Sequence, residues 1–370
     1  ISFYLLDEDR QTSYYIYRAE LGTGQEAFAA KFVPGTHVSI TAAQNAYYKG
    51  VYETGQGKVK KSMITLGGKE ALDMTKLEPY AIDNDLFAEA KAGDDMLGSK
   101  ISFRNQSNIV SLTNWTVDKV VTSADFATDK QDGLNYQLLK LKKNDVTVTV
   151  GLSKYLQGVY THKNQDAITD SDTIVKGISD IKTKFKAGDV VSVTGMFSYS
   201  TDNGGYQIYP FSAEDVKAGT PDAAGTTYEG TAVGETLKAI ATAVTTQKMT
   251  SLITANKEFT LTASSTNAVV TYSLCSDSAT VKINNNKITV NPGRKETVYL
   301  KANVKVGNYE AWMLIPVSSE GKTDAEMIAS EKGVLATVIG DISKAGETVL
   351  PIKGKTYETV TFSNWAIKGE

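Results

Sequence analysis

The pattern of hydrophobic and polar residues along the chain is mainly that of β-strands. Apolar and polar residues alternate over many short segments, among them Val146–Val150 (VTVTV), Val190–Gly195, Glu258–Ser264 and Val298–Val304. Glycine, asparagine and aspartate interrupt these segments at short intervals, as expected for tight connections between strands. The sequence therefore predicts an all-β protein with a few short helices.

Four segments have the composition and spacing of short helices: residues 69–77, 85–91, 236–243 and 324–332. A run of about 18 apolar residues would indicate a membrane-spanning helix, and none occurs. We therefore expect accessory helices between β-modules and no transmembrane segment.

The chain also contains an internal repeat. Residues 34–53 (PGTHVSITAAQNAYYKGVYE) parallel residues 187–210 (AGDVVSVTGMFSYSTDNGGYQIYP). In both copies a glycine opens a strand, an aromatic turn follows, and a second glycine precedes another strand. A hairpin comes before each copy, at residues 3–17 and 136–150, with acidic or asparagine residues at its turn. The repeat predicts two related β-modules.

The order of hairpin, connector, GDVVSVTG strand and glycine-aromatic hairpin resembles the OB-fold modules of bacterial secreted proteins. Such modules are small five-stranded Greek-key barrels. The second copy, residues 97–217, matches this order best, whereas GTHVSITA replaces the strand motif in the first copy. The chain begins where the second OB strand would be, so the first copy is expected to lack its first strand or to receive it from elsewhere.

Residues 249–318 resemble the atypical Ig-like modules of bacterial secreted proteins, through FTL, VTYSLCSDSATVKI, KITVNP and the long final pair of strands. Tyr272 stands where that family usually has tryptophan. Asn284, Asn285 and Asn286 predict a tight turn between strands. The tail, residues 347–370, resembles the opening strands of a second such module, with Trp365 in the aromatic position.

These patterns divide the chain into six segments. They are an OB-like module (1–66), a helical connector (67–96), an OB-like module (97–217), a linker with a short helix (218–248), an Ig-like module (249–320), and a helix with the opening strands of a further Ig-like module (321–370).

Composition narrows the chemistry that we expect. The 39 basic and 42 acidic residues give a net charge of -3, which provides no general attraction for nucleic acid. A single cysteine, Cys275, excludes an internal disulfide and a cysteine-rich zinc site. The two histidines, His37 and His162, leave little room for histidine-based catalysis. GTAVGET (Gly230–Thr236) lacks the lysine and the spacing of a phosphate loop. We therefore expect no catalytic centre and no resident cofactor.

A calcium site is the one metal site that the sequence suggests. Asp166, Asp170 and Asp172 are closely spaced in a polar segment, and Ca²⁺ requires several oxygen ligands. Solvated turns and helix caps use the same residues.

Candidate ligand-binding residues lie in the two OB-like copies: Tyr15, Tyr17, Tyr206, Tyr209, Lys182, Lys184 and Lys186. Tyrosine rings would stack on a sugar or a base, although tyrosine is also a favoured strand residue. The three lysines recur at every second position, which in a strand places them on one face. Such a face would bind along the backbone of an anionic polymer. Alternatively, it would only keep a solvent-exposed strand from aggregating at its edge. Trp115 and Trp312 are equally consistent with core anchors.

Together these features predict a non-catalytic extracellular binding or scaffold protein, on the cell surface, with a glycan as ligand. The chain begins at Ile1 without a signal peptide, which indicates a processed piece of a longer protein. One alternative is an accessory nucleic-acid-binding role beside a nuclease. Another is a filament or surface-layer subunit that self-associates by strand exchange between incomplete terminal modules.

Overall fold

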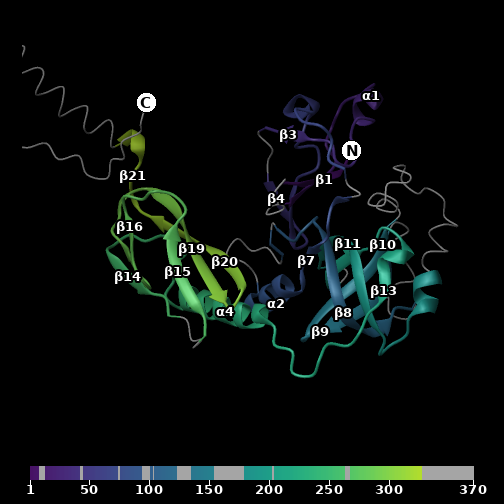
Figure 1. Cartoon of the computed structure of the whole chain (residues 1–370). Coiled ribbons are helices and arrows are strands. Elements are labelled where there is room, and N and C mark those ends of the chain that lie inside the picture. Colours follow the sequence, from purple (N-terminus) through teal and green to yellow (C-terminus); the bar gives the residue numbers. More distant parts are fainter. Residues whose placement is uncertain are drawn as a thin grey trace, which may run out of the picture. The chain divides into compact units, whose positions relative to one another are not determined.

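The computed structural model describes residues 1–7, 13–41, 45–73, 76–93, 101–102, 104–122, 135–153, 179–201, 204–262 and 267–326. The chain divides into two compact units, Ile1–Glu235 and Thr236–Glu370. Strands form most of the regular structure of both units, and helices are few (Figure 1). The predicted all-β class is confirmed.

A closed five-stranded barrel forms the larger part of the first unit. Its strands are β8 (Ile109–Val120), β9 (Asn135–Lys143), β10 (Val146–Ser153), β11 (Val190–Ser200) and β12 (Gly205–Tyr209). They follow the order β8-β9-β10-β12-β11, and β11 pairs with β8 to close the ring. The β10–β12 pair is parallel and the others are antiparallel. This connectivity is that of an OB-like barrel, as the second repeat predicts.

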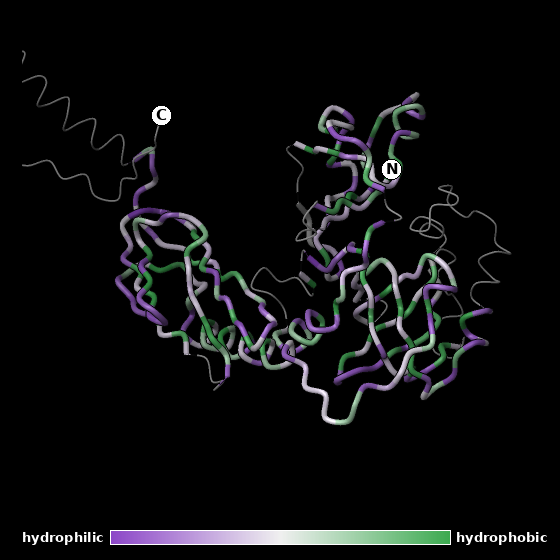
Figure 2. The backbone as a smooth tube through the Cα atoms, viewed as in Figure 1, coloured by the Kyte–Doolittle hydropathy of each residue, from purple (hydrophilic) through white to green (hydrophobic). Residues whose placement is uncertain are grey.

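The sequence alternation explains the core of the barrel. Along β10, Val146, Val148 and Val150 are buried, and the same period recurs at Leu139 and Leu141 of β9. Hydrophobic and hydrophilic residues accordingly alternate along these strands (Figure 2). The two strands are joined by Asn144 and Asp145, which both have positive φ. That conformation matches the twist of a two-residue hairpin.

Helices complete this core from outside the ring. Residues 179–184 are helical, and Ile181 and Phe185 insert into the barrel interior. Helix α2 (Asp83–Ala92) contributes Leu86 and Phe87, and the Phe87 ring stacks on Trp115 with centroids 6.0 Å apart. Short strands β7 (Tyr80–Ala81) and β13 (Val216–Ala218) extend the sheet, and a 3-10 turn, η4 (Ala213–Asp215), precedes β13.

The N-terminal part of the first unit repeats the same pairings. Its elements are β1 (Phe3–Leu6), β2 (Ser13–Ile16), α1 (Glu26–Ala29), β3 (Val38–Ile40), β4 (Asn45–Tyr48), β5 (Val51–Thr54), η1 (Lys61–Met63) and β6 (Ile64–Leu66). β1–β2 is antiparallel, β2–β5 parallel and β4–β5 antiparallel, as in β9–β10, β10–β12 and β11–β12. β3 pairs with β6 as the first half of β11 pairs with β13. Each strand of the first copy thus has a counterpart in the second.

The second unit contains two three-stranded sheets. One is β14 (Lys257–Thr260), β17 (Lys287–Val290) and β16 (Val281–Asn284), and the other is β15 (Val269–Leu274), β19 (Glu296–Val306) and β20 (Tyr309–Ser319). β18 (Gly293–Arg294) and β21 (Gly321–Lys322) form a further short pair. Asn284 pairs with Lys287, and Asn285 between them has a φ of 55°. The predicted asparagine turn is therefore confirmed.

The predicted helices have mixed outcomes. Residues 85–91 lie inside α2, and residues 236–243 lie inside α4 (Glu229–Thr246). Residues 69–73 are not helical, and of residues 324–332 only the first three, which are helical, are described. Helix α4 begins well before the predicted segment, because Gly230 and Gly234 allow it to pack closely on α2. A Cβ at Gly230 would lie 2.1 Å from the carbonyl oxygen of Asn84. The linker interpretation of residues 229–235 was wrong.

Candidate functional site

Three tyrosines form a row on one face of the N-terminal sheet. Tyr4 of β1 stacks on Tyr15 of β2, with ring centroids 4.7 Å apart, and the Tyr15 and Tyr17 centroids are 5.9 Å apart. Tyr14, the residue before Tyr15, packs with Ile16 in the small core on the opposite face of the sheet. Strand alternation therefore separates the tyrosine row (Tyr4, Tyr15 and Tyr17) from the core.

Polar groups surround the tyrosine row. The Arg18 guanidinium lies 5.1 Å from the centroid of the Tyr17 ring, in cation–π geometry. The Ser2 hydroxyl accepts a hydrogen bond from the Arg18 backbone at 3.0 Å. Glu53 is the neighbour of Tyr15 on β5, and burial raises the pKa of its carboxyl. The row therefore combines ring faces with groups that can form hydrogen bonds.

Burial of its hydroxyl end raises the pKa of Tyr4 well above the usual range, with smaller contributions from the nearby Tyr15, Tyr209 and Glu53 groups. The residue nevertheless keeps 38% of its surface exposed. We conclude that the ring is the accessible part and that the hydroxyl is held inside. A rigid, half-exposed ring is well suited to stacking against a ligand.

The other two predicted tyrosines are placed differently. Tyr206 of β12 packs against the buried Phe197, with centroids 5.8 Å apart, and against Tyr199, and burial raises its pKa well above the usual value. Tyr209 packs beside the buried Met196 and Phe211, and its phenol lies near that of Tyr4. The fold thus brings Tyr15 and Tyr17 together with Tyr209 nearby, and uses Tyr206 in packing.

The predicted lysine face does not exist. Lys182 and Lys184 lie in the helical segment 179–184, and Lys186 follows it in a loop. Residues two apart on a helix point to nearly opposite sides. The Lys184 ammonium instead donates a hydrogen bond to the Val216 carbonyl at 3.2 Å. In the sequence, lysines alternate with Ile181, Thr183 and Phe185, as they would along a strand. In the structure, Ile181 and Phe185 are four residues apart at a helix, so both side chains face the core.

The tryptophans have separate roles. Trp115 is fully buried in the barrel, whereas Trp312 on β20 is 52% exposed. The Lys301 ammonium lies 4.8 Å from the Trp312 ring centroid. Met313, Ile315 and Val317 are buried, so the alternation along β20 could have identified Trp312 as outward-facing.

The suggested calcium ligands, Asp166, Asp170 and Asp172, lie outside the described residues. Within the described ranges, no group of three or more histidine, cysteine or acidic side chains is arranged to hold a metal ion.

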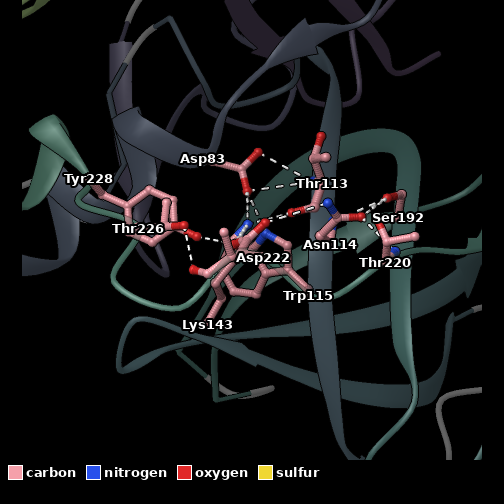
Figure 3. A network of polar contacts seen from close by, with 11 residues as sticks. Asp83, Thr113, Asn114, Trp115, Lys143, Ser192, Thr220, Asp222, Thr226 and Tyr228 are labelled. Carbon is pink, nitrogen blue, oxygen red and sulfur yellow. Dashed lines mark hydrogen bonds and ion pairs between the residues drawn. The ribbon is translucent and has the colours of Figure 1, made fainter.

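A polar network at one end of the barrel was not foreseen from the sequence (Figure 3). The Lys143 ammonium lies 2.8 Å from Asp222 and 3.7 Å from Asp83, and it donates to the Thr113 carbonyl at 2.6 Å. The Trp115 indole donates to Asp83 at 2.7 Å, and the Tyr228 hydroxyl donates to Asp222. Burial raises the pKa of Asp83, whereas Lys143 lowers that of Asp222. Since these groups form hydrogen bonds and ion pairs with one another, we interpret the network as a polar clamp that holds residues 219–228 in place.

Comparison with known proteins finds no matching family model and no curated protein with significant sequence similarity. Among the helices of the described ranges, none has the length and apolar character needed to span a membrane.

Proposed function

We propose that this chain is a non-catalytic, extracellular surface-binding protein that holds a glycan against the tyrosine row. The observation that carries the proposal is the continuous arrangement of Tyr4, Tyr15 and Tyr17, stacked or tilted at 4.7 and 5.9 Å on one sheet face. The modular all-β sequence, which resembles bacterial surface modules, supports the extracellular location.

The chemistry of the row suits a sugar ring. The face of a sugar carries C–H groups that pack on an aromatic ring, while its hydroxyls need donors and acceptors at the edge. The Arg18 guanidinium, which also donates to the Gln56 side chain at 3.3 Å, can supply donors beside Tyr17. Because the rings are held by stacking and by the strands, little side-chain entropy would be lost on binding.

The test is an array of polysaccharides, oligosaccharides and single-stranded nucleic acids, probed with the chain at low and at physiological salt. We expect binding to one glycan class that does not depend on salt. The double variant Tyr15→Ala/Tyr17→Ala should lose at least tenfold in affinity. Binding that appears only with nucleic acid and weakens with salt would overturn the proposal.

Two matched variants locate the site. Tyr299 and Trp312 are exposed aromatic residues of the second unit, 39% and 52% exposed. We expect Tyr299→Ala and Trp312→Ala to retain full glycan affinity. If these variants lose affinity while the Tyr15/Tyr17 variant keeps it, the tyrosine row is not the site.

A further inference from the structure

Strand β15 is an edge strand of the second unit, and its outer side is unpaired among the described residues. In its sheet, β15 pairs with β19 on one side only. The Cys275 N–H donates to the Tyr299 carbonyl at 2.9 Å, and in an antiparallel ladder every second residue bonds to the same neighbour. The backbone N–H and C=O groups of Val270, Tyr272 and Leu274 therefore point away from β19. They are available to a further strand.

The other edge strands of the two described sheets carry residues that oppose such pairing. β14 contains Lys257 and Glu258, β16 contains Lys282, and β20 contains Pro316. Charged side chains and proline are the usual protection of an exposed strand edge. β15 (VVTYSL) has neither, and most of its residues are favoured in strands. Among these edges, β15 is therefore the one that is open to pairing.

A cleft of about 640 Å³ lies beside the same edge. Its described lining includes Leu261, Val270, Tyr272 and Ile283 and no residue of β19. The Tyr272 hydroxyl donates to the Leu261 carbonyl at 3.2 Å, which fixes the ring in the wall of the cleft. Val270, Tyr272 and Leu274 share the core face of the sheet with buried residues of β19, yet they are only half-buried. Apolar side chains of another strand would complete their burial.

We propose that β15 pairs with β15 of a second copy of this chain, antiparallel and around a twofold axis at Tyr272. In this register all three free positions are paired, because Val270 lies opposite Leu274 of the other copy and Tyr272 lies opposite its own counterpart. The pairing joins two three-stranded sheets into one continuous sheet. Since each chain supplies this edge once, the assembly closes as a dimer. The inference does not depend on the glycan proposal.

The sequence of β15 is complementary to itself in this register. On the outward face, the 64% exposed Val269 lies opposite Cys275 of the second copy, an exposed and weakly polar side chain. Thr271 lies opposite Ser273, and such hydroxyl pairs form hydrogen bonds across antiparallel strands. The strand carries no charge, so no like charges meet across the axis. This self-complementarity favours a second copy over an unrelated strand.

The experiment is disulfide trapping with Val269→Cys in the full chain, which keeps its native Cys275. In the expected register the new cysteine and Cys275 of the other copy form a non-hydrogen-bonded pair. Their Cα atoms would be about 4.5 Å apart, which a disulfide can bridge. Within one strand the two positions are roughly 20 Å apart, too far for an internal bond. We therefore expect oxidation to give a covalent dimer and little larger product.

Thr271→Cys is the matched control. It lies diagonally from Cys275 of the other copy, at about 7–8 Å, and should give far less dimer. Absence of a covalent dimer with Val269→Cys, or an equal yield from the control, would overturn the proposal. A ladder of larger multimers would also overturn it, because a closed twofold pair cannot extend.

A second measurement avoids engineered cysteines. Thr271→Lys/Ser273→Lys places lysines directly opposite one another across the axis. We expect the parent chain to sediment as a dimer at high concentration and the variant to have a roughly tenfold higher dissociation constant. Thr246→Lys/Thr250→Lys adds the same charge at exposed positions outside β15 and should leave the dimer unchanged. A parent chain that stays monomeric, or a dimer that both variants leave intact, would contradict the pairing of β15.

Discussion

The side-chain amide of Gln106 takes the place of a peptide group beside Tyr52. Its Oε1 accepts a hydrogen bond from the Tyr52 backbone at 2.9 Å, and its Nε2 lies 3.3 Å from the carbonyl oxygens of Tyr52 and Ser13. The Ser13 hydroxyl donates to the Gln106 carbonyl. The parallel pairing of β2 with β5 covers Tyr15 and Ile16, and Gln106 continues the ladder beyond them. The turn before β8 is thereby joined to the N-terminal sheet.

Replacing Gln106 should loosen this connection. Gln106→Ala removes the acceptor of the half-buried Tyr52 backbone N–H, a loss of roughly 1–3 kcal/mol. We expect faster amide hydrogen exchange at β2 and β5 and unchanged exchange in the second unit. Gln56→Ala, at an exposed position, is the control. Exchange at Tyr52 that remains as slow as in the parent chain would show that the amide does not support the ladder.

The glycines of α4 should resist replacement even though alanine favours helices. Alanine is about 1 kcal/mol better than glycine in a helix interior. A Cβ at Gly234, however, would lie 2.4 Å from the Ala88 carbonyl oxygen. We expect Gly234→Ala to lower the free energy of unfolding by roughly 1–3 kcal/mol, the usual cost of overpacking. Glu235→Ala, at the exposed next position, tests propensity alone. A more stable Gly234→Ala protein in urea titration would contradict the close packing of α2 and α4.

Local patterns predicted the parts of this fold that depend on local physics. Alternation predicted β10 and β19, and asparagine predicted the turns at Asn144 and Asn285. The interpretation of the sequence was wrong where one residue type is common in two kinds of structure. Glycine at positions 230 and 234 suggested a linker, but it serves helix packing, which depends on the partner α2. The lysines around Phe185 suggested a strand, because a helix of two turns and a strand share short-range alternation.

The candidate site was only partly predictable for a related reason. Tyr15 and Tyr17 are two residues apart in one strand, so their shared face follows from the sequence. Tyr4 joins them only through the register of β1 against β2. Tyr206 is also a strand tyrosine, like Tyr15. Its neighbour across the sheet, however, is Tyr199, and the two rings fill the space beside Phe197. Contacts between strands distant in sequence decide such cases.

Lys143 should be the most sensitive position of the polar clamp in Figure 3. Lys143→Met removes the cation between Asp83 and Asp222 and leaves the Asp83 carboxylate mostly buried, with 17% exposure. Breaking a buried pair costs about 3–5 kcal/mol, and partial exposure reduces the expected loss to roughly 2 kcal/mol. Lys142→Met, on the exposed face of the same strand, is the control. Equal melting temperatures for the two variants would show that the clamp contributes little.

Glu89 of α2 should make the first unit sensitive to pH. Its Oε1 accepts hydrogen bonds from the Ser102 backbone at 3.1 Å and from the Asn105 amide at 2.6 Å. The other oxygen, Oε2, and the Asn105 Oδ1 are buried, and neither has a hydrogen-bond partner among the residues that the structure describes. Burial and then the Asp85 carboxylate raise the pKa of Glu89 to about 8. Tyr206 also faces it, and Arg104 and Tyr80 contact Asp85. A proton on Oε2, donated to Asn105 Oδ1, would satisfy both atoms.

The sign of the pH effect follows from this raised pKa. Because the native state keeps a proton that the unfolded chain releases above its ordinary pKa of 4.5, the free energy of unfolding should fall as pH rises from about 4.5 to about 8. The slope is at most ~1.4 kcal/mol per pH unit, the value for one proton. In Glu89→Gln, an amide N–H can replace the carboxyl proton, so this slope should disappear from urea titrations at a series of pH values. Glu214→Gln, on the exposed surface, should keep the slope of the parent chain. If the parent and Glu89→Gln profiles run parallel, Glu89 is ionised in the native state and the buried pair with Asn105 carries no proton.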